Sequence, residues 1–248
     1  MDKPLLTKVD FGRAEIVQKE GQLMLNTILP PSRKELFLWE VSSSPLTRLF
    51  DEALDNIHYA GSCKRVGRCM RLAIIKNKTW VGGIGLGSTF PNIDARDRFL
   101  GLKKYLHNFK ERGLKSPWAR ENSAYWTRLQ RIVNHTRTFI FPSFQGQGLG
   151  VRAHKILLSD GINLWEKKYS GKIAALDTLC DHGDSKLFLA NGWTLVGETK
   201  GYCSNPKAIF SDRTDKRKPF KNNVALMRNP NNQKWVVWVK LIKPTLIS

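Results

Sequence analysis

Cysteine is scarce in this chain of 248 residues, and its four cysteines form no Cys-x-x-Cys pair. Because that spacing is typical of zinc and redox sites, we expect reduced thiols in a cytoplasmic protein and no metal site. No apolar run approaches the length needed to cross a bilayer, and the first residues lack the pattern of a secretory signal. These absences predict a cytoplasmic protein that does not bind a membrane.

Acidic residues are also few. The chain has 21 Asp and Glu against 41 Lys and Arg, a formal net charge of +20, and its sequence pI is about 10.0. A surplus of this size in a folded chain implies a polyanionic partner, most often nucleic acid and here most simply DNA. The alternative is a generally basic, solvated surface.

A glycine-rich segment stands out at the centre of the chain. Residues 134–141 are rich in β-branched and aromatic side chains and predict a strand, and a helix is predicted from near Val151. Between them, Gln145-Gly146-Gln147-Gly148-Leu149-Gly150 would present main-chain N–H groups at a helix start, where they can bind phosphate. A simple tight turn is the alternative. The chain has no Gly-x-x-x-x-Gly-Lys-Ser/Thr motif, and Gln145 stands where a Rossmann fingerprint needs glycine.

The surrounding pattern predicts alternating helices and strands in one domain at residues 45–248, preceded by an extension at residues 1–44. Strands are expected at 22–28, 35–41, 70–75, 80–87, 172–180, 193–198, 224–227 and 235–242, and helices at 46–57, 151–168 and 184–191. A basic insertion at about 90–131 and a basic loop at about 205–222 interrupt this order. Phosphate contacts are expected from their cations, namely Arg96, Arg98, Lys103, Lys104, Arg213, Lys216, Arg217 and Lys218. A solvated loop and a helical subdomain with its own core are the alternatives.

Gln145, Gly148 and Gly150 resemble the Gln-x-x-Gly-x-Gly signature of the GNAT acyltransferases. Blocks such as Ala95-Arg96-Asp97-Arg98 and Gly197-Glu198-Thr199-Lys200-Gly201 are similar to the family of the Druantia anti-phage protein DruA, over about residues 56–204. The layout is more remotely similar to the phage DNA-modification protein Mom. These resemblances imply an α+β fold (an α/β sandwich) with a GNAT-like mixed, mostly antiparallel sheet and flanking helices. They also imply a splay between Thr136–Phe141 and Lys172–Cys180 that admits a pantetheine arm.

The same resemblance implies acetyl-CoA or another acyl-CoA as cofactor. Main-chain N–H groups near residues 140–143 would bind the pantetheine, and those of the glycine turn the diphosphate. The cofactor-binding residues would be Ile140, Phe141, Ser143, Gln145, Gln147, Gly148, Leu149, Gly150 and Arg152.

Four polar residues are candidates for the reacting end of this site. Asp177 stands in an otherwise apolar strand, where a carboxylate is costly unless paired or functional, and Asp181 follows that strand. Asn134 and Arg137 belong to the central strand and could orient a base or a phosphate. For Asp177 the alternative is a salt bridge to Arg137.

The conjunction of this turn, the positive charge and the family blocks favours an acyl-CoA-dependent transferase that modifies nucleic acid, most simply a base in DNA, in a phage or anti-phage context. Two other functions fit the same residues. One is a non-enzymatic nucleic-acid-binding protein on a degenerate GNAT scaffold, and the other is a GNAT acting on a protein or a small amine.

Overall fold

A single mixed sheet runs through the molecule in the computed structural model, which describes residues 11–29, 34–58, 61, 67–105, 124–180, 185–199 and 234–247. The strand order is β1-β2-β3-β4-β5-β7-β6. The strands are β1 (Leu36–Glu40), β2 (Cys69–Lys76), β3 (Thr79–Ser88), β4 (Ile132–Ile140), β5 (Ala175–Cys180), β6 (Thr194–Glu198) and β7 (Val236–Leu241). Five of the six strand pairings are antiparallel and only β4 with β5 is parallel, which confirms the predicted mixed, mostly antiparallel sheet.

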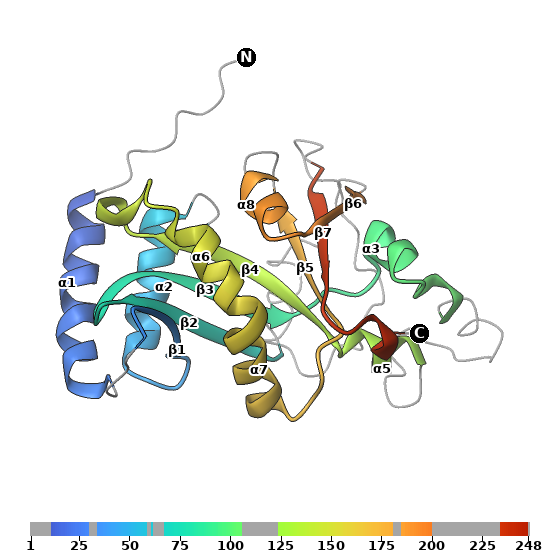
Figure 1. Cartoon of the computed structure of the whole chain (residues 1–248), viewed down its shortest axis with the longest axis horizontal. Coiled ribbons are helices and arrows are strands. Elements are labelled where there is room, and N and C mark those ends of the chain that lie inside the picture. Colours follow the sequence, from blue (N-terminus) through green and yellow to red (C-terminus); the bar gives the residue numbers. More distant parts are fainter. Residues whose placement is uncertain are drawn as a thin grey trace, which may run out of the picture.

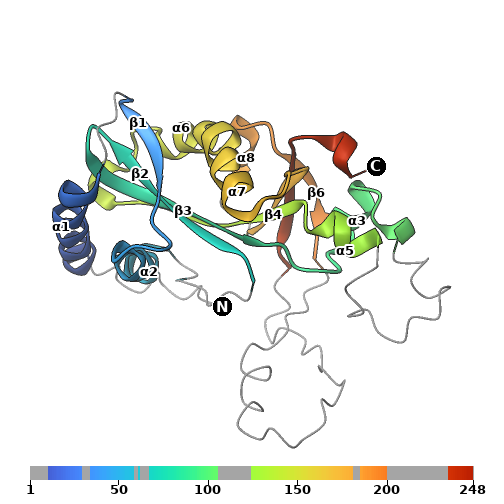
Figure 2. The same ribbon diagram turned by 90° about the horizontal axis from the view of Figure 1, so that it is seen from below.

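Helices cover both faces of this sheet. They are α1 (Phe11–Ile28), α2 (Leu46–Ile57), α3 (Asp94–Phe99), α5 (Ala124–Leu129), α6 (Leu149–Ile156), α7 (Ile162–Tyr169) and α8 (Ser185–Ala190). Figure 2 shows α6 and α7 on one face, and α1 and α2 on the other. Each face has its own apolar core: Trp165 of α7 packs in a cluster with Leu72 of β2 on one face, and Phe50 of α2 packs in a cluster with Trp80 of β3 on the other. The sheet is therefore the middle layer of a sandwich (Figure 1).

The N-terminal segment corrects one prediction and confirms another. A strand at residues 22–28 is wrong, because this stretch is the end of helix α1. The buried side chains of Ala14, Val17 and Leu25 recur at helical spacing, so that one side of α1 packs on the sheet and on α2. The strand expected at 35–41 is β1, which pairs with β2. The predicted extension thus supplies a helix and an edge strand to the same fold.

Strands β2 and β3 correspond to the strands expected at 70–75 and 80–87, and they form a hairpin. Its turn residues Asn77 and Lys78 both have positive φ, at 48° and 64°, as the tight turns that suit a twisted hairpin require. The glycine run of β3 contains a bulge, with a register shift between Gly85 and Leu86. A Cβ at Gly85 would lie 2.4 Å from the Thr136 hydroxyl oxygen. Glycine therefore lets β4 approach β3 closely at this point.

The helix predicted at 151–168 begins two residues earlier, at Leu149, and contains one π-helical turn at Leu157–Gly161 before α7. The other elements expected after it are α8, β6 and β7, and the strand expected at 224–227 lies outside the described residues. Within the described part of the chain, no helix is both long and apolar enough to span a membrane.

Candidate functional site

The central strands β4 and β5 separate soon after they meet. They pair only at Ile132 with Ala175, Val133 with Leu176, and Asn134 with Asp177. Beyond this point β4 continues along β3 as far as Ile140, whereas β5 continues along β7 as far as Cys180 (Figure 1). The predicted splay is therefore present. Among the described residues, no strand pairs with the β5-facing edge of β4 beyond Asn134, so that a ligand could pair with it in this gap.

The main chain at the end of β4 points partly into this gap. The Phe141 N–H donates to the Val81 carbonyl at 3.0 Å, and alternate residues of a strand direct their polar groups to opposite sides. The N–H of Ile140 is therefore directed away from β3 and into the gap, as its predicted role requires. Its carbonyl accepts from the Gln145 side chain at 3.0 Å. Phe141 differs from its prediction, because its N–H is bound to β3 and its ring is buried in the core.

The glycine turn forms an exposed helix N-terminus. Gly146 and Gly148 both have left-handed φ, at 78° and 66°, and a Cβ at either would meet no atom within 4 Å. Gly148 is the N-cap of α6, and its carbonyl accepts the first helical hydrogen bond from the Arg152 N–H at 3.2 Å. The N–H groups of Leu149 and Gly150 therefore have no acceptor within the helix. Since the Leu149 side chain is buried, the turn offers its main chain, with the positive end of the helix dipole, to an anion.

Two cations flank this turn. The Arg152 guanidinium pairs with Glu35 at 3.3 Å, and both side chains are about half exposed. The Lys76 ammonium donates to the Gln147 side-chain oxygen at 3.3 Å. The sequence predicted Arg152 as a diphosphate-binding residue. It did not predict Lys76, because Lys76 lies on β2, far from the turn along the chain.

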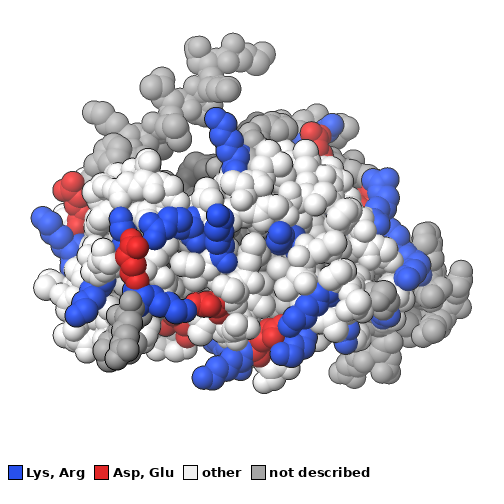
Figure 3. All heavy atoms as spheres, viewed as in Figure 1, with Lys and Arg blue, Asp and Glu red and all other residues white. Residues whose placement is uncertain are grey.

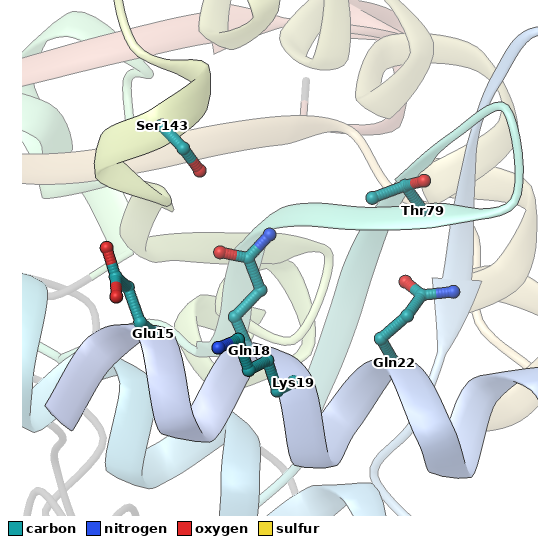
Figure 4. Close-up of a pocket in the computed structure, with 6 residues that line it drawn as sticks. All are labelled: Glu15, Gln18, Lys19, Gln22, Thr79 and Ser143. Atoms are coloured by element: carbon teal, nitrogen blue, oxygen red, sulfur yellow. The ribbon is translucent and has the colours of Figure 1, made fainter. Parts of the chain in front are cut away.

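A polar pocket of about 370 Å³ lies between α1, the start of β3 and the segment that carries Ser143 (Figure 4). Its lining residues are Glu15, Gln18, Lys19, Gln22, Thr79 and Ser143. The Ser143 hydroxyl is directed into this pocket in Figure 4. Any contact of Ser143 with a cofactor in the β4–β5 gap would therefore come from its main chain.

A buried polar network fills the point where β4 and β5 separate. The Asp177 carboxylate is fully buried and accepts from the Asn134 amide at 2.7 Å, from the Arg96 guanidinium at 2.8 Å, and from the Thr89 hydroxyl. Asp177 is thus held in a salt bridge, but with Arg96 and not with Arg137. A carboxylate whose oxygens already accept from these donors is poorly placed to remove a proton.

Arg96 requires a correction. It was expected to bind nucleic acid, but its side chain is completely buried and also donates to Asp97 at 2.6 Å. Asp97 in turn accepts from the Tyr125 hydroxyl at 2.9 Å. Burial raises the pKa of Asp97, although the charge of Arg96 opposes this shift. Burial likewise raises the pKa of Tyr125 to about 12. The basic insertion is therefore anchored to β5 through its own arginine.

Of the remaining cations that were predicted to bind nucleic acid, only some lie in the described part of the chain. Arg98 is exposed and pairs with Asp94, which also pairs with Lys103, and the Lys104 ammonium lies 5.0 Å from the centre of the Tyr105 ring. The other predicted residues lie outside the described part of the chain, namely Asp181, Arg213, Lys216, Arg217 and Lys218.

Arg137 lies on β4 just beyond the last residue that pairs with β5. Its guanidinium donates to the Gly61 carbonyl at 3.3 Å, and the Gly61 N–H donates to the His58 carbonyl at 2.8 Å. Burial, with a smaller contribution from the Arg137 charge, lowers the pKa of His58 to about 4. His58 is therefore neutral at pH 7 and can accept a proton, although it is a weak base.

A histidine pair that the sequence did not reveal joins the glycine turn to β4. The Nδ1 atom of His154 lies 2.8 Å from the Gly150 carbonyl, and its Nε2 atom lies 3.1 Å from Nε2 of His135. Because a carbonyl only accepts, Nδ1 of His154 carries the proton, and His135 donates between the two rings. The one available signal was that His154 follows Gly150 by four residues on the helix.

This pair predicts a dependence of stability on pH. Burial lowers the pKa of His154 to about 4 from 6.5. Between these pH values His154 of the unfolded chain binds a proton, whereas His154 of the folded chain does not. The contribution of neutral His154 to stability is therefore complete above pH 6.5 and is lost as the pH falls towards 4. The free energy of unfolding should fall by about 3 kcal/mol over this window because of His154. We expect His154→Gln to lose this part of the slope in urea unfolding series, and an unchanged slope would contradict the assignment.

Comparisons with known proteins give similarity only at the level of structure. No protein-family profile matches the chain, and a search of curated proteins finds no relative. An aminoglycoside acetyltransferase solved with coenzyme A is 12% identical, with a TM-score of 0.43 over 84% of this chain and 96% of that protein. A ribosomal-protein alanine N-acetyltransferase from Escherichia coli is 10% identical, with a TM-score of 0.42 over 84% and 94% of the two chains. Identities this low transfer no substrate to this chain.

Proposed function

We propose that this protein is a GNAT-type transferase that moves an acyl group from acyl-CoA to nucleic acid, most simply to an amine of a DNA base. One observation carries the proposal. The strand whose edge loses its partner at Asn134 leads directly into the exposed helix N-terminus at Gly148. A long ligand with an amide-bearing arm and a diphosphate would find main-chain partners along this single path.

Each part of the coenzyme has a proposed place on that path. The N–H groups of the glycine turn near Gly148 and Gly150 would hold the diphosphate, and the N–H of Ile140 in the gap would hold the pantetheine arm. The thioester then lies towards the point where β4 and β5 separate. The acceptor nitrogen attacks the thioester carbonyl, the C–N bond forms, the C–S bond breaks, and CoA leaves as thiolate. The nitrogen gives up its proton to a base, for which neutral His58 beside Arg137 is a candidate.

Charge and exposed aromatic rings support a polynucleotide as the acceptor. The whole chain carries a net charge of +20, and Lys and Arg are spread over the face shown in Figure 3 with fewer Asp and Glu. Next to the buried network, Phe90 and Phe99 are 52% and 43% exposed, and Arg98 and Lys104 lie on the same insertion. Exposed rings and cations together can stack on bases and bind phosphates.

Mass spectrometry of nucleosides tests this proposal. DNA from cells that express the protein is digested and compared with DNA from cells that express Gly148→Glu. We expect an acylated nucleoside only in the first sample, because the variant should not bind the coenzyme. Unmodified DNA together with coenzyme binding would point to a protein or small amine as acceptor. DNA binding without coenzyme binding would point to a non-enzymatic nucleic-acid-binding protein.

A further inference from the structure

Lys76 differs from several described lysines whose charge is neutralised by a carboxylate. Lys34, Lys168 and Lys172 each form an ion pair with a carboxylate, at 2.7 to 2.9 Å. In the described part of the chain, no carboxylate pairs with Lys76, and its ammonium instead donates to the neutral side-chain oxygen of Gln147. Its positive charge is therefore not neutralised at the place where it is held.

That place is the glycine turn itself. Lys76 is the last residue of β2, and Gln147 stands between the two left-handed glycines Gly146 and Gly148. The hydrogen bond thus brings a cation from the sheet to the exposed helix N-terminus. The nearest basic residue on the helix, Arg152, is already paired with Glu35. The Lys76 ammonium can move from the amide oxygen to a phosphate oxygen, because a hydrogen bond between two charged groups is stronger than one from an ammonium to a neutral amide oxygen.

We propose that Lys76 is the side-chain cation of the diphosphate site, and that its ammonium moves from Gln147 to a phosphate oxygen when the coenzyme binds. This inference rests on the proposed function, since it assigns a residue to the same coenzyme site. It makes Lys76 a positioning and affinity residue that another strand contributes to the main-chain cradle. If Lys76 served only to link the hairpin to the turn through Gln147, its replacement would leave coenzyme binding unchanged.

Calorimetry with three probes tests the assignment: acetyl-CoA, acetyl-3′-dephospho-CoA and S-acetylpantetheine, which has no phosphate. We expect Lys76→Met to weaken binding of the first two by the same factor, about tenfold, and to leave the third unchanged. Lys76→Arg should keep most of the affinity. Lys78→Met is the matched control, because it removes the same charge from an exposed position of the same hairpin turn. It should bind all probes as the wild type does.

Each other outcome has a distinct meaning. Wild-type affinity for acetyl-CoA in Lys76→Met would overturn the assignment and leave the proposed function intact. An equal loss for S-acetylpantetheine would show that the substitution disturbs the turn, and this also overturns a charge role. A loss of affinity for acetyl-CoA alone would show that Lys76 contacts the 3′-phosphate, and this overturns the diphosphate assignment. If the wild type itself does not bind acetyl-CoA, the proposed function fails and the Lys76 assignment fails with it.

Discussion

Replacing Gly148 by glutamate is expected to weaken acetyl-CoA binding by about 100-fold or more, equivalent to about 3 kcal/mol. Gly148 is the N-cap of α6 and is open to solvent, so the new side chain meets no atom within 4 Å of its Cβ. The carboxylate would stand at the proposed diphosphate site and would repel the diphosphate. It would also compete for the same N–H groups, because a negative charge is itself favoured at a helix N-terminus. Titration calorimetry of the wild type and the variant measures the difference directly.

The chain offers a closely matched control for this substitution. Gly101 also has a φ of 66°, and a Cβ there also meets no atom within 4 Å. Gly101→Glu therefore adds the same charge and the same strain at a turn that lies outside the proposed coenzyme site. We expect it to bind acetyl-CoA as the wild type does. Similar losses in both variants would show that backbone strain, and not the diphosphate site, accounts for the effect.

Replacing Arg96 by methionine is expected to lower the free energy of unfolding by about 3–5 kcal/mol. The substitution would leave the carboxylates of Asp97 and Asp177 buried without the cation that they share. Removing one partner of a buried ion pair is costly for this reason, even where the intact pair adds little to stability. Urea unfolding followed by circular dichroism gives the free energy, and limited proteolysis would report loosening of the α3–α5 region.

Arg98→Met is the matched control, because Arg98 lies on the same helix and its side chain is 70% exposed. It should change the free energy of unfolding by no more than about 0.5 kcal/mol. The double variant Arg96→Met with Asp177→Asn should cost less than the sum of the two single changes, because the second removes a charge that the first leaves unpaired. An additive double variant, or equal effects at Arg96 and Arg98, would contradict the buried network.

Local patterns were sufficient where a structure depends on neighbours in sequence. The β2–β3 hairpin, helix α2 and the start of α6 were predicted to within a few residues, since turn glycines, caps and apolar spacing are all local signals. No part of helix α1 was predicted, and its second half was assigned to a strand, because its apolar residues are few and its exposed side includes Ile16 and Leu23. Its helical state follows from packing against the sheet, through residues such as Leu25, and packing is not a local property.

The candidate site shows the same division. The exposed main chain of residues 145–150 could be predicted, because the glycines there leave main-chain N–H groups accessible at the start of an amphipathic helix whatever surrounds them. The ion-pair partner of Asp177 could not be predicted from the sequence. Arg96 and Arg137 are both arginines in polar surroundings, and only the fold brings the first within 2.8 Å of Asp177, across 81 residues of sequence.

The amino-acid sequence by itself determined the basic charge, the succession of most helices and strands, and the glycine turn, because these follow from composition and from contacts along the chain. Only the tertiary structure decided which arginine is buried, that His135 and His154 share a proton, and that Lys76 reaches the turn. Those features depend on which strands become neighbours and where β4 leaves β5. That choice is made by the packing of the whole sheet between its helices, where the burial of each side chain depends on all the others.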